Sequence, residues 1–206
     1  MLAIYFLLRT ADCRQLTTDS GPSEGVLPMH SEKARAGMKH PDRWLAALRI
    51  GVGLWFLYGG IRKVTFFLWG GFLPLPIATD RWIGFMPKRI AEFASGTPIA
   101  WYKEFLEGTA LHNPKLFASL TAWGEFSVGV GLTLGLLTVL AGLIGLVMMV
   151  IYFLATFWMG PGPQGFHLLL IACMIVFFAS KAGRTWGLDG WLVHRFPNRT
   201  LPRLFC

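Results

Sequence analysis

One apolar run constrains this sequence more than any other feature. From Leu116 to Met159 the chain holds 44 residues, and Glu125 is the only charged one among them. A single helix of that length would extend roughly 66 Å, which is about twice the thickness of a bilayer core. The run must therefore fold back once. We expect the turn near Leu137–Ala141, between two antiparallel helices at 116–136 and 140–159.

Two further apolar segments, Trp44–Ile61 and Phe166–Ala182, flank this run. Of the 206 residues, 54% are hydrophobic and 15% are charged, whereas soluble domains usually carry about 25% charge. The sequence therefore predicts an all-α membrane protein built as a bundle of four transmembrane helices, embedded in the lipid bilayer.

The long loop between the first and second predicted helices is expected to be partly helical and to lie at the membrane interface. Its stretch FFLWGGFLPLP, residues 66–76, suggests interfacial or re-entrant chain. The amphipathic pieces RIAEFA and WYKEFLEG suit short helices on the membrane surface. The later breaker GPGPQG, residues 160–165, is expected to separate the third and fourth membrane helices.

Three regions follow from this pattern. Residues 1–43 are predicted to be a disordered basic tail, 44–192 the membrane domain and 193–206 a second basic tail. Met29 and Met38 both precede the first helix, and we hypothesise that translation starts at one of them.

The basic residues favour one orientation. Four spans place both termini on one side, and the cationic tails favour the cytoplasmic side of a prokaryotic cytoplasmic membrane. Many of the cations behind the net charge of +8 flank apolar segments, so this charge does not require a nucleic-acid partner.

Glu125 is the first candidate for chemistry. It would lie roughly 13 Å along its helix, near the middle of the membrane, where an acid costs a few kcal/mol unless it is paired, hydrated or protonated. One interpretation is a catalytic proton acceptor, and the other is a structural link to a base on another helix. Arg62 and Lys63 are the candidate bases, whereas Arg49, nearer the other end of the first helix, is expected to snorkel outward.

Other polar features are weaker. His112 and His167 would share the outer membrane face, where they could hydrogen-bond a quinone carbonyl or simply be interfacial polar residues. No third ligand at metal spacing accompanies them, so we expect no metal centre. Ser127, Gly131 and Gly135 recur every four residues and predict a helix-packing seam.

Several stretches together resemble one family. They are LRIGVGLWFLYGGIRK at 48–63, the stretch from WYKEFLEG to LTLGLLT at 101–138, and SKAGRTWGLDGW at 180–191. This pattern resembles the DoxX/DoxD-like membrane proteins over 44–192, and above all in Gly124–Glu125, Ala182–Gly183–Arg184 and Gly187–Leu188–Asp189. The DoxD branch is the small subunit of thiosulfate:quinone oxidoreductase. Family members often carry a basic residue where this chain has Val139.

The resemblance implies a quinone as substrate near the outer face, with electrons delivered by a partner subunit. On this reading Arg62, Lys63 and Lys103 attract an anion such as thiosulfate and Glu125 handles protons. His112, His167 and Trp123 would contact the quinone or the substrate, and Arg184 and Asp189 form the family exit motif.

Three alternatives differ from this reading. A non-catalytic membrane anchor or assembly subunit, bound to a partner or to a second copy, needs no reactive residue. A small transporter is disfavoured because the sequence shows no inverted repeat. A thiol oxidase is disfavoured because Cys13, Cys173 and Cys206 form no thiol pair.

Overall fold

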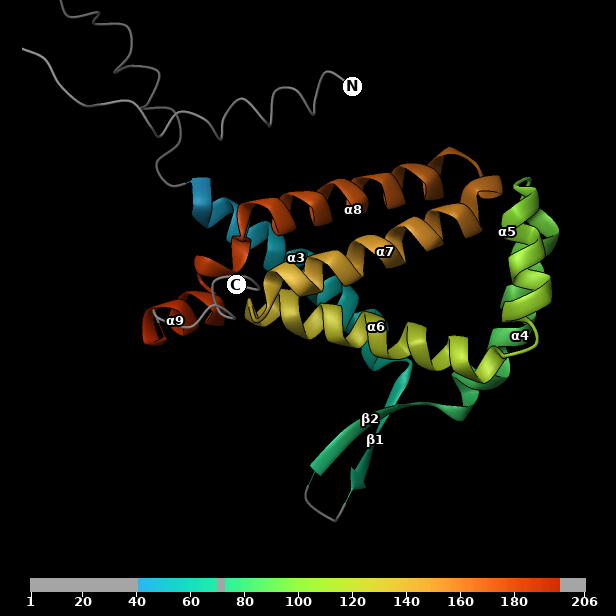
Figure 1. The fold of residues 1–206 in the computed structure, drawn as a ribbon, viewed down its shortest axis with the longest axis horizontal. Coiled ribbons are helices and arrows are strands. Elements are labelled where there is room, and N and C mark those ends of the chain that lie inside the picture. The colour runs from blue at the N-terminus through green and yellow to red at the C-terminus, as the bar shows by residue number, and fades with distance from the viewer. Residues whose placement is uncertain (1–40, 70–72, 197–206) are drawn as a thin grey trace, which may run out of the picture. The chain divides into compact units, whose positions relative to one another are not determined.

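The computed structural model describes residues 41–69 and 73–196, and their fold is mostly helical (Figure 1). The predicted tail 1–40, with the candidate starts Met29 and Met38, lies outside the described residues, as does 197–206. The long helices are α3 (Pro41–Ile61), α6 (Pro114–Leu134), α7 (Thr138–Thr156) and α8 (Pro161–Ser180). The shorter elements are β1 (Val64–Trp69), β2 (Leu73–Ala78), α4 (Asp80–Gly96), α5 (Ala100–Phe105), the π-helical turn η1 (Leu106–Ala110), the 3-10 turns η2 (Phe157–Met159) and η3 (Ala182–Arg184), and α9 (Leu188–Arg195).

Three helices in the described part of the chain are long and apolar enough to cross a membrane. They are α3, α7 continued through η2, and α8. Helix α6 has the same length as α3, but Lys115, Glu125 and several Gly, Ser and Thr residues lower its hydropathy. The chain is therefore a membrane protein, and α6 as a fourth span stays a prediction.

The reversal between α6 and α7 is short. Gly135 ends α6 in the left-handed conformation with φ 63°, as glycine commonly does after a helix. Leu137 is also left-handed with φ 49°, and α7 begins at Thr138. The turn thus lies at 135–137 and overlaps the expected region, 137–141, only at Leu137.

The breaker 160–165 is placed differently from the prediction. Helix α8 begins inside it, at Pro161, five residues before the expected start. Proline fits the first position of a helix because its fixed φ is already helical and its missing N–H has no partner to lose there. Only Gly160, with φ 95°, remains as the break itself.

The loop between α3 and α6 contains a β-hairpin that the all-α prediction lacked. Strand β1 pairs antiparallel with β2, with Val64 opposite Ala78. Pro74 and Pro76 are compatible with β2 because a two-stranded sheet has only edge strands, where a missing N–H is tolerated. The ring of Phe66 packs edge-on against Phe126 at 5.9 Å, which joins the hairpin to α6. The two amphipathic pieces are helical as expected, in α4 and in α5 with η1.

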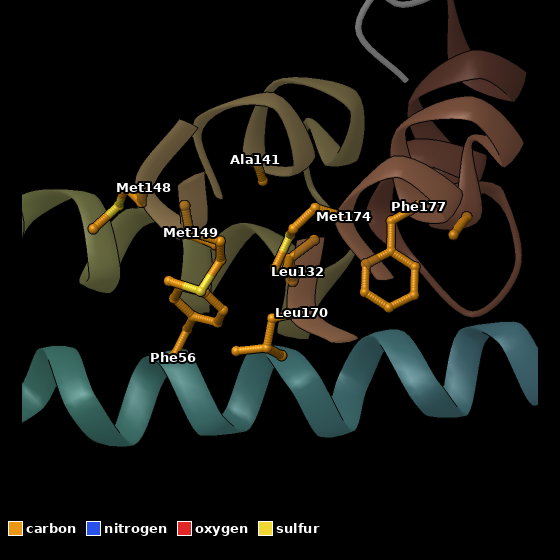
Figure 2. Packing of buried hydrophobic residues seen from close by; sticks show 10 residues of the cluster. Phe56, Leu132, Ala141, Met148, Met149, Leu170, Met174 and Phe177 are labelled. Carbon is orange, nitrogen blue, oxygen red and sulfur yellow. The ribbon is translucent and has the colours of Figure 1, made fainter. Parts of the chain in front are cut away.

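A methionine-rich core joins the four long helices. Figure 2 shows Met148 and Met149 of α7 and Met174 of α8 among the buried side chains, with Phe56 of α3 beside Met149. Flexible thioether chains fill irregular gaps between helices, which suits this position.

Glycines allow α3 and α6 to touch closely. A Cβ at Gly129 would lie 2.4 Å from the backbone N of Leu57, and one at Gly60 would lie 2.7 Å from the Cα of Phe126. The predicted seam is used elsewhere, since a Cβ at Gly131 would lie 2.8 Å from that of Ala141 on α7.

Candidate functional site

Glu125 is buried within the described structure and carries two partners. Its residue exposure is 6%. The Lys63 ammonium lies 2.6 Å from each carboxylate oxygen, and the Tyr152 hydroxyl donates to Oε1 at 2.7 Å. Hydrogen bonds between charged groups are short and strong, and burial strengthens them further. Of the two candidate bases, the structure pairs Lys63 with Glu125, whereas Arg62 donates to the Tyr58 hydroxyl at 3.2 Å.

The backbone positions Lys63 directly over α6. Lys63 follows the end of α3 in a turn that its N–H closes onto the Gly60 carbonyl at 2.9 Å. Gly59 faces the carboxylate, and a Cβ there would lie 3.0 Å from Oε2 of Glu125. The absence of a side chain at Gly59 therefore gives the ion pair its space.

Trp82 holds the ammonium from another side. Its ring centroid lies 4.4 Å from Lys63 Nζ, which is cation–π geometry. Its indole N–H lies 3.1 Å from the Ala118 carbonyl and 3.2 Å from the Thr121 hydroxyl oxygen. Trp82 thus fastens the start of α4 to α6 and orients Lys63 at the same time.

His167 lies beside this group, at the start of α8. Its Nδ1 is 2.7 Å from the Pro163 carbonyl and 3.2 Å from the Thr156 hydroxyl oxygen, while that hydroxyl donates to the Tyr152 carbonyl. A carbonyl only accepts, so Nδ1 carries a hydrogen. In the neutral ring, Nε2 is then the nitrogen with a free lone pair.

These residues line a cavity of about 850 Å³. Three cations, Arg62, Lys63 and Arg81, line it together with a single carboxylate, that of Glu125. The rest of the wall is mainly aromatic and apolar, and it includes Trp55, Phe56, Tyr58, Trp82, Phe85, Met149, Phe166 and Leu170. A concave apolar site with a few convergent polar groups is typical of small-molecule binding.

The structure gathers only some of the site residues expected from the sequence. Arg62, Lys63, Glu125 and His167 line this one cavity. The other three expected contacts, Lys103, His112 and Trp123, do not.

Each of these three has another environment. Lys103 lies 3.9 Å from Glu107 in an exposed pair, and His112 is exposed with Nδ1 3.0 Å from the Glu107 carbonyl. Lys103 lies in α5 and His112 just after η1, and neither residue lines the cavity. Trp123 lines a separate groove between α6 and α7, because it lies on a different face of α6 from Glu125.

The exit motif forms a second polar cluster away from the cavity. Asp189 is fully buried and accepts hydrogen bonds from the backbone N–H groups of Leu137 at 2.7 Å and Thr138 at 2.8 Å. Its own N–H donates to the Gly135 carbonyl at 2.8 Å. Arg184 lies in η3, just before this cluster. Asp189 therefore supplies hydrogen-bond acceptors for the backbone N–H groups of the α6–α7 turn, which is a structural role.

Arg49 belongs to the same cluster and does not snorkel. Its side chain is fully buried and donates to the Trp186 carbonyl at 3.0 Å. A Cβ at Gly187 would lie 2.8 Å from one guanidinium nitrogen, so glycine is needed for this packing.

Sequence reasoning missed Tyr152, Trp82 and Arg81. A signal existed for Tyr152, since a tyrosine inside an apolar run needs a partner for its hydroxyl. No sequence signal pointed to Trp82 or Arg81, because their position in the cavity wall depends on how α4 docks on α6.

Among the residues that the structure describes, no three His, Cys, Asp or Glu side chains lie close enough together to hold a metal ion. No solved structure significantly matches this chain. The model of one family, described as TQO small subunit DoxD, matches residues 44–204, which is most of the chain. The chain therefore belongs to the DoxD family.

Proposed function

We propose that this DoxD-family membrane protein supports quinone-linked oxidation of thiosulfate, and that the quinone headgroup binds in the cavity beside Glu125. The family description, small subunit of TQO, motivates the reaction. The observation that carries the location is the Lys63–Glu125–Tyr152 group, centred on the buried Glu125, which lines a cavity with aromatic walls. Aromatic walls suit a flat ring, and polar groups at one end suit its carbonyl oxygens.

The balance of the reaction assigns tasks to these groups. Oxidative coupling of two thiosulfate ions forms one S–S bond and releases two electrons. Reduction of one quinone to hydroquinone consumes two electrons and two protons. Tyr152 is the group placed to pass a proton to a quinone oxygen, and His167 can donate from Nε2 only as the imidazolium, because the neutral ring gives its one hydrogen to the Pro163 carbonyl. The two protons come from water: Glu125 would take up a proton and pass it to Tyr152 after that hydroxyl has donated its own, with Lys63 balancing the charge of the carboxylate between transfers.

In this proposal, basic residues of the cavity attract thiosulfate to the site. Arg62 and Arg81 are exposed and line the same cavity as Lys63. Clustered charge of one sign concentrates ions of the other sign near a site. A partner subunit supplies the electron path in this proposal, since the small subunit of an oxidoreductase works with another chain.

A non-catalytic membrane anchor is the second candidate. One observation favours it: Lys63 engages both oxygens of Glu125, which is what a purely structural ion pair between α3 and the neighbouring α6 would also show. The two proposals differ in whether the cavity binds anything.

Quinone binding tests the proposal directly. Purified protein in nanodiscs would be titrated with a short-chain ubiquinone and a menaquinone analogue, and quenching of tryptophan fluorescence would be followed. Trp55 and Trp82 line the cavity and report binding there. We expect saturable quenching, with a smaller amplitude in Trp82→Phe and an unchanged amplitude in Trp191→Phe, whose residue lies in α9.

Turnover then separates catalysis from anchoring. In native membranes, Glu125→Gln and Tyr152→Phe are expected to lower thiosulfate-dependent quinone reduction at least tenfold. Lys103→Gln is the matched control, since its residue lies outside the cavity. Absence of saturable quinone binding, together with unchanged copurification of a partner, would support the anchor instead.

A further inference from the structure

We infer that the cavity has a second, apolar opening between α3 and α8, edged by Trp55 and Phe166, through which a quinone enters from the bilayer with its tail left in lipid. This inference rests on the proposed quinone function. It concerns the route of entry and the residues that select for a membrane-dissolved ligand.

The packing of the helices leaves this side open. Helix α3 packs mainly on α6, and α8 packs mainly on α7, so α3 and α8 contact one another only weakly. In Figure 1 the two helices approach each other near the start of α3 and the end of α8, and they diverge toward the start of α8. Helix α3 lines the cavity through Trp55 and Tyr58 and α8 lines it through Phe166 and Leu170, so these two helices form one side of its wall.

Both helices are candidate membrane spans with little of their surface covered. In the apolar window of α8 only 17% of the residues are buried, and in that of α3 28%. Most of the surface of these two helices is therefore left uncovered by the described part of the chain. In a membrane, lipid acyl chains lie against such faces.

An aromatic pair stands at the edge of this opening. The rings of Trp55 and Phe166 are 5.7 Å apart in edge-on geometry, and they connect α3 to α8 directly. Both are well exposed, at 58% and 42%. Two contacting rings at the surface can be parted by side-chain rotation, without moving either helix backbone.

The size of the cavity requires an exit for the tail. A volume of about 850 Å³ suits one drug-sized molecule, such as a quinone ring with its substituents. A tail of many isoprenoid units does not fit in addition. Another part of the rim carries Arg62 and Arg81, and burying hydrocarbon beside these charges would displace their water. The Trp55–Phe166 opening is apolar and borders the two spans, so we assign the tail to it.

A reversible bridge across the opening tests this route. Trp55→Cys and Phe166→Cys would be combined with Ser at Cys13, Cys173 and Cys206, and a short bis-thiosulfonate reagent would link α3 to α8. Trp82, still present in the cavity, reports binding by quenching in nanodiscs. The probes are a tailless dimethoxy-methyl-benzoquinone and a ubiquinone with several isoprenoid units.

We expect the bridge to slow association of the long-tailed quinone at least tenfold. The tailless quinone should keep its Kd within about twofold, and reduction of the bridge should restore the rate. Leu54→Cys with the same reagent is the control, since Leu54 is exposed on α3 and does not line the cavity.

Other outcomes separate the two proposals. If neither quinone is slowed, or if both are slowed equally, the apolar entry route is wrong while the quinone site stands. If neither quinone binds even before bridging, the proposed quinone function fails, and the entry route fails with it.

Discussion

The ammonium of Lys63 lies 2.6 Å from each of the two carboxylate oxygens of Glu125, across 62 residues of sequence. The Lys63 side chain is 20% exposed and the Glu125 side chain 8% exposed, so the pair reaches from a buried acid toward the cavity. In this geometry the ammonium places its positive charge beside both carboxylate oxygens. The same pair joins the end of α3 to α6 and lines the cavity proposed to bind the quinone, and variants can separate these two roles.

Breaking the pair on one side should be costly. Lys63→Met leaves Glu125 buried without its cation, and we expect a loss of about 3 kcal/mol in the free energy of unfolding. Lys63→Met combined with Glu125→Leu should recover most of that loss, because no unpaired charge remains. Thermal unfolding in detergent measures both. Lys103→Met, which removes an exposed pair, should change stability by at most about 0.5 kcal/mol, and an equal loss there would contradict this account.

The contact between α3 and α6 depends on glycine at one face. In Gly129→Ala the new Cβ would lie 2.4 Å from the Leu57 backbone N, so the helices must move apart. We expect a loss of about 1–3 kcal/mol, as for overpacked cores. Gly51→Ala is the matched control on α3, where a Cβ meets nothing within 4 Å. It should be neutral or stabilising by up to about 1 kcal/mol, because alanine favours helix over glycine.

Asp189 should control the local stability of the α6–α7 turn. Asp189→Asn keeps one acceptor oxygen, so one of the two turn N–H groups loses its partner at a cost of about 1–3 kcal/mol. We expect faster hydrogen exchange at the amides of Leu137 and Thr138, measured by mass spectrometry. Trp191→Phe, on an exposed α9 position, should leave that exchange unchanged. Slow exchange in Asp189→Asn would mean that the carboxylate is not needed there.

Tyr102 gives the protein a dependence on high pH. It is 3% exposed and donates to the Ile151 carbonyl, and burial raises the pKa of its phenol to about 12. In the unfolded chain the pKa is about 10. Between these values the folded state keeps a proton that the unfolded state loses, so this stabilisation is complete below pH 10 and is lost as the pH rises to 12. Phenolate absorbance should show a late-titrating component that shrinks in Tyr102→Phe and persists in Tyr58→Phe.

Hydropathy and spacing placed the long helices to within a few residues, except at α8. There, the glycines and prolines of residues 160–165 predicted a break that included Pro161. A proline is, however, compatible with the first position of a helix, and α8 begins at Pro161. The hairpin was missed for a related reason, because Pro74 and Pro76 argue against a strand unless both of its neighbours are known. The pairing of the two strands depends on contacts between separate segments of the chain, and a local sequence pattern does not predict such contacts.

For the site too, local sequence features predicted some residues, whereas others depended on tertiary packing. Glu125 stood out because a lone acid in an apolar run must find a partner, and helix geometry limited the base to Arg62 or Lys63. Choosing Lys63 required knowing how the turn after α3 closes. Tyr152 could have been found, because a tyrosine hydroxyl in an apolar run needs a partner, whereas Trp82 reaches the site only through the docking of α4 on α6.

The order of Lys63 and Glu125 along the chain has a consequence for biogenesis. Lys63 follows α3, which is synthesised before α6, so the cation is in place when the acid emerges. A helix with an unpaired central acid inserts poorly by itself. As the predicted fourth span, α6 would therefore depend on α3 as an insertion partner, and we expect that α6 expressed without α3 stays outside the bilayer until α3 is supplied in trans.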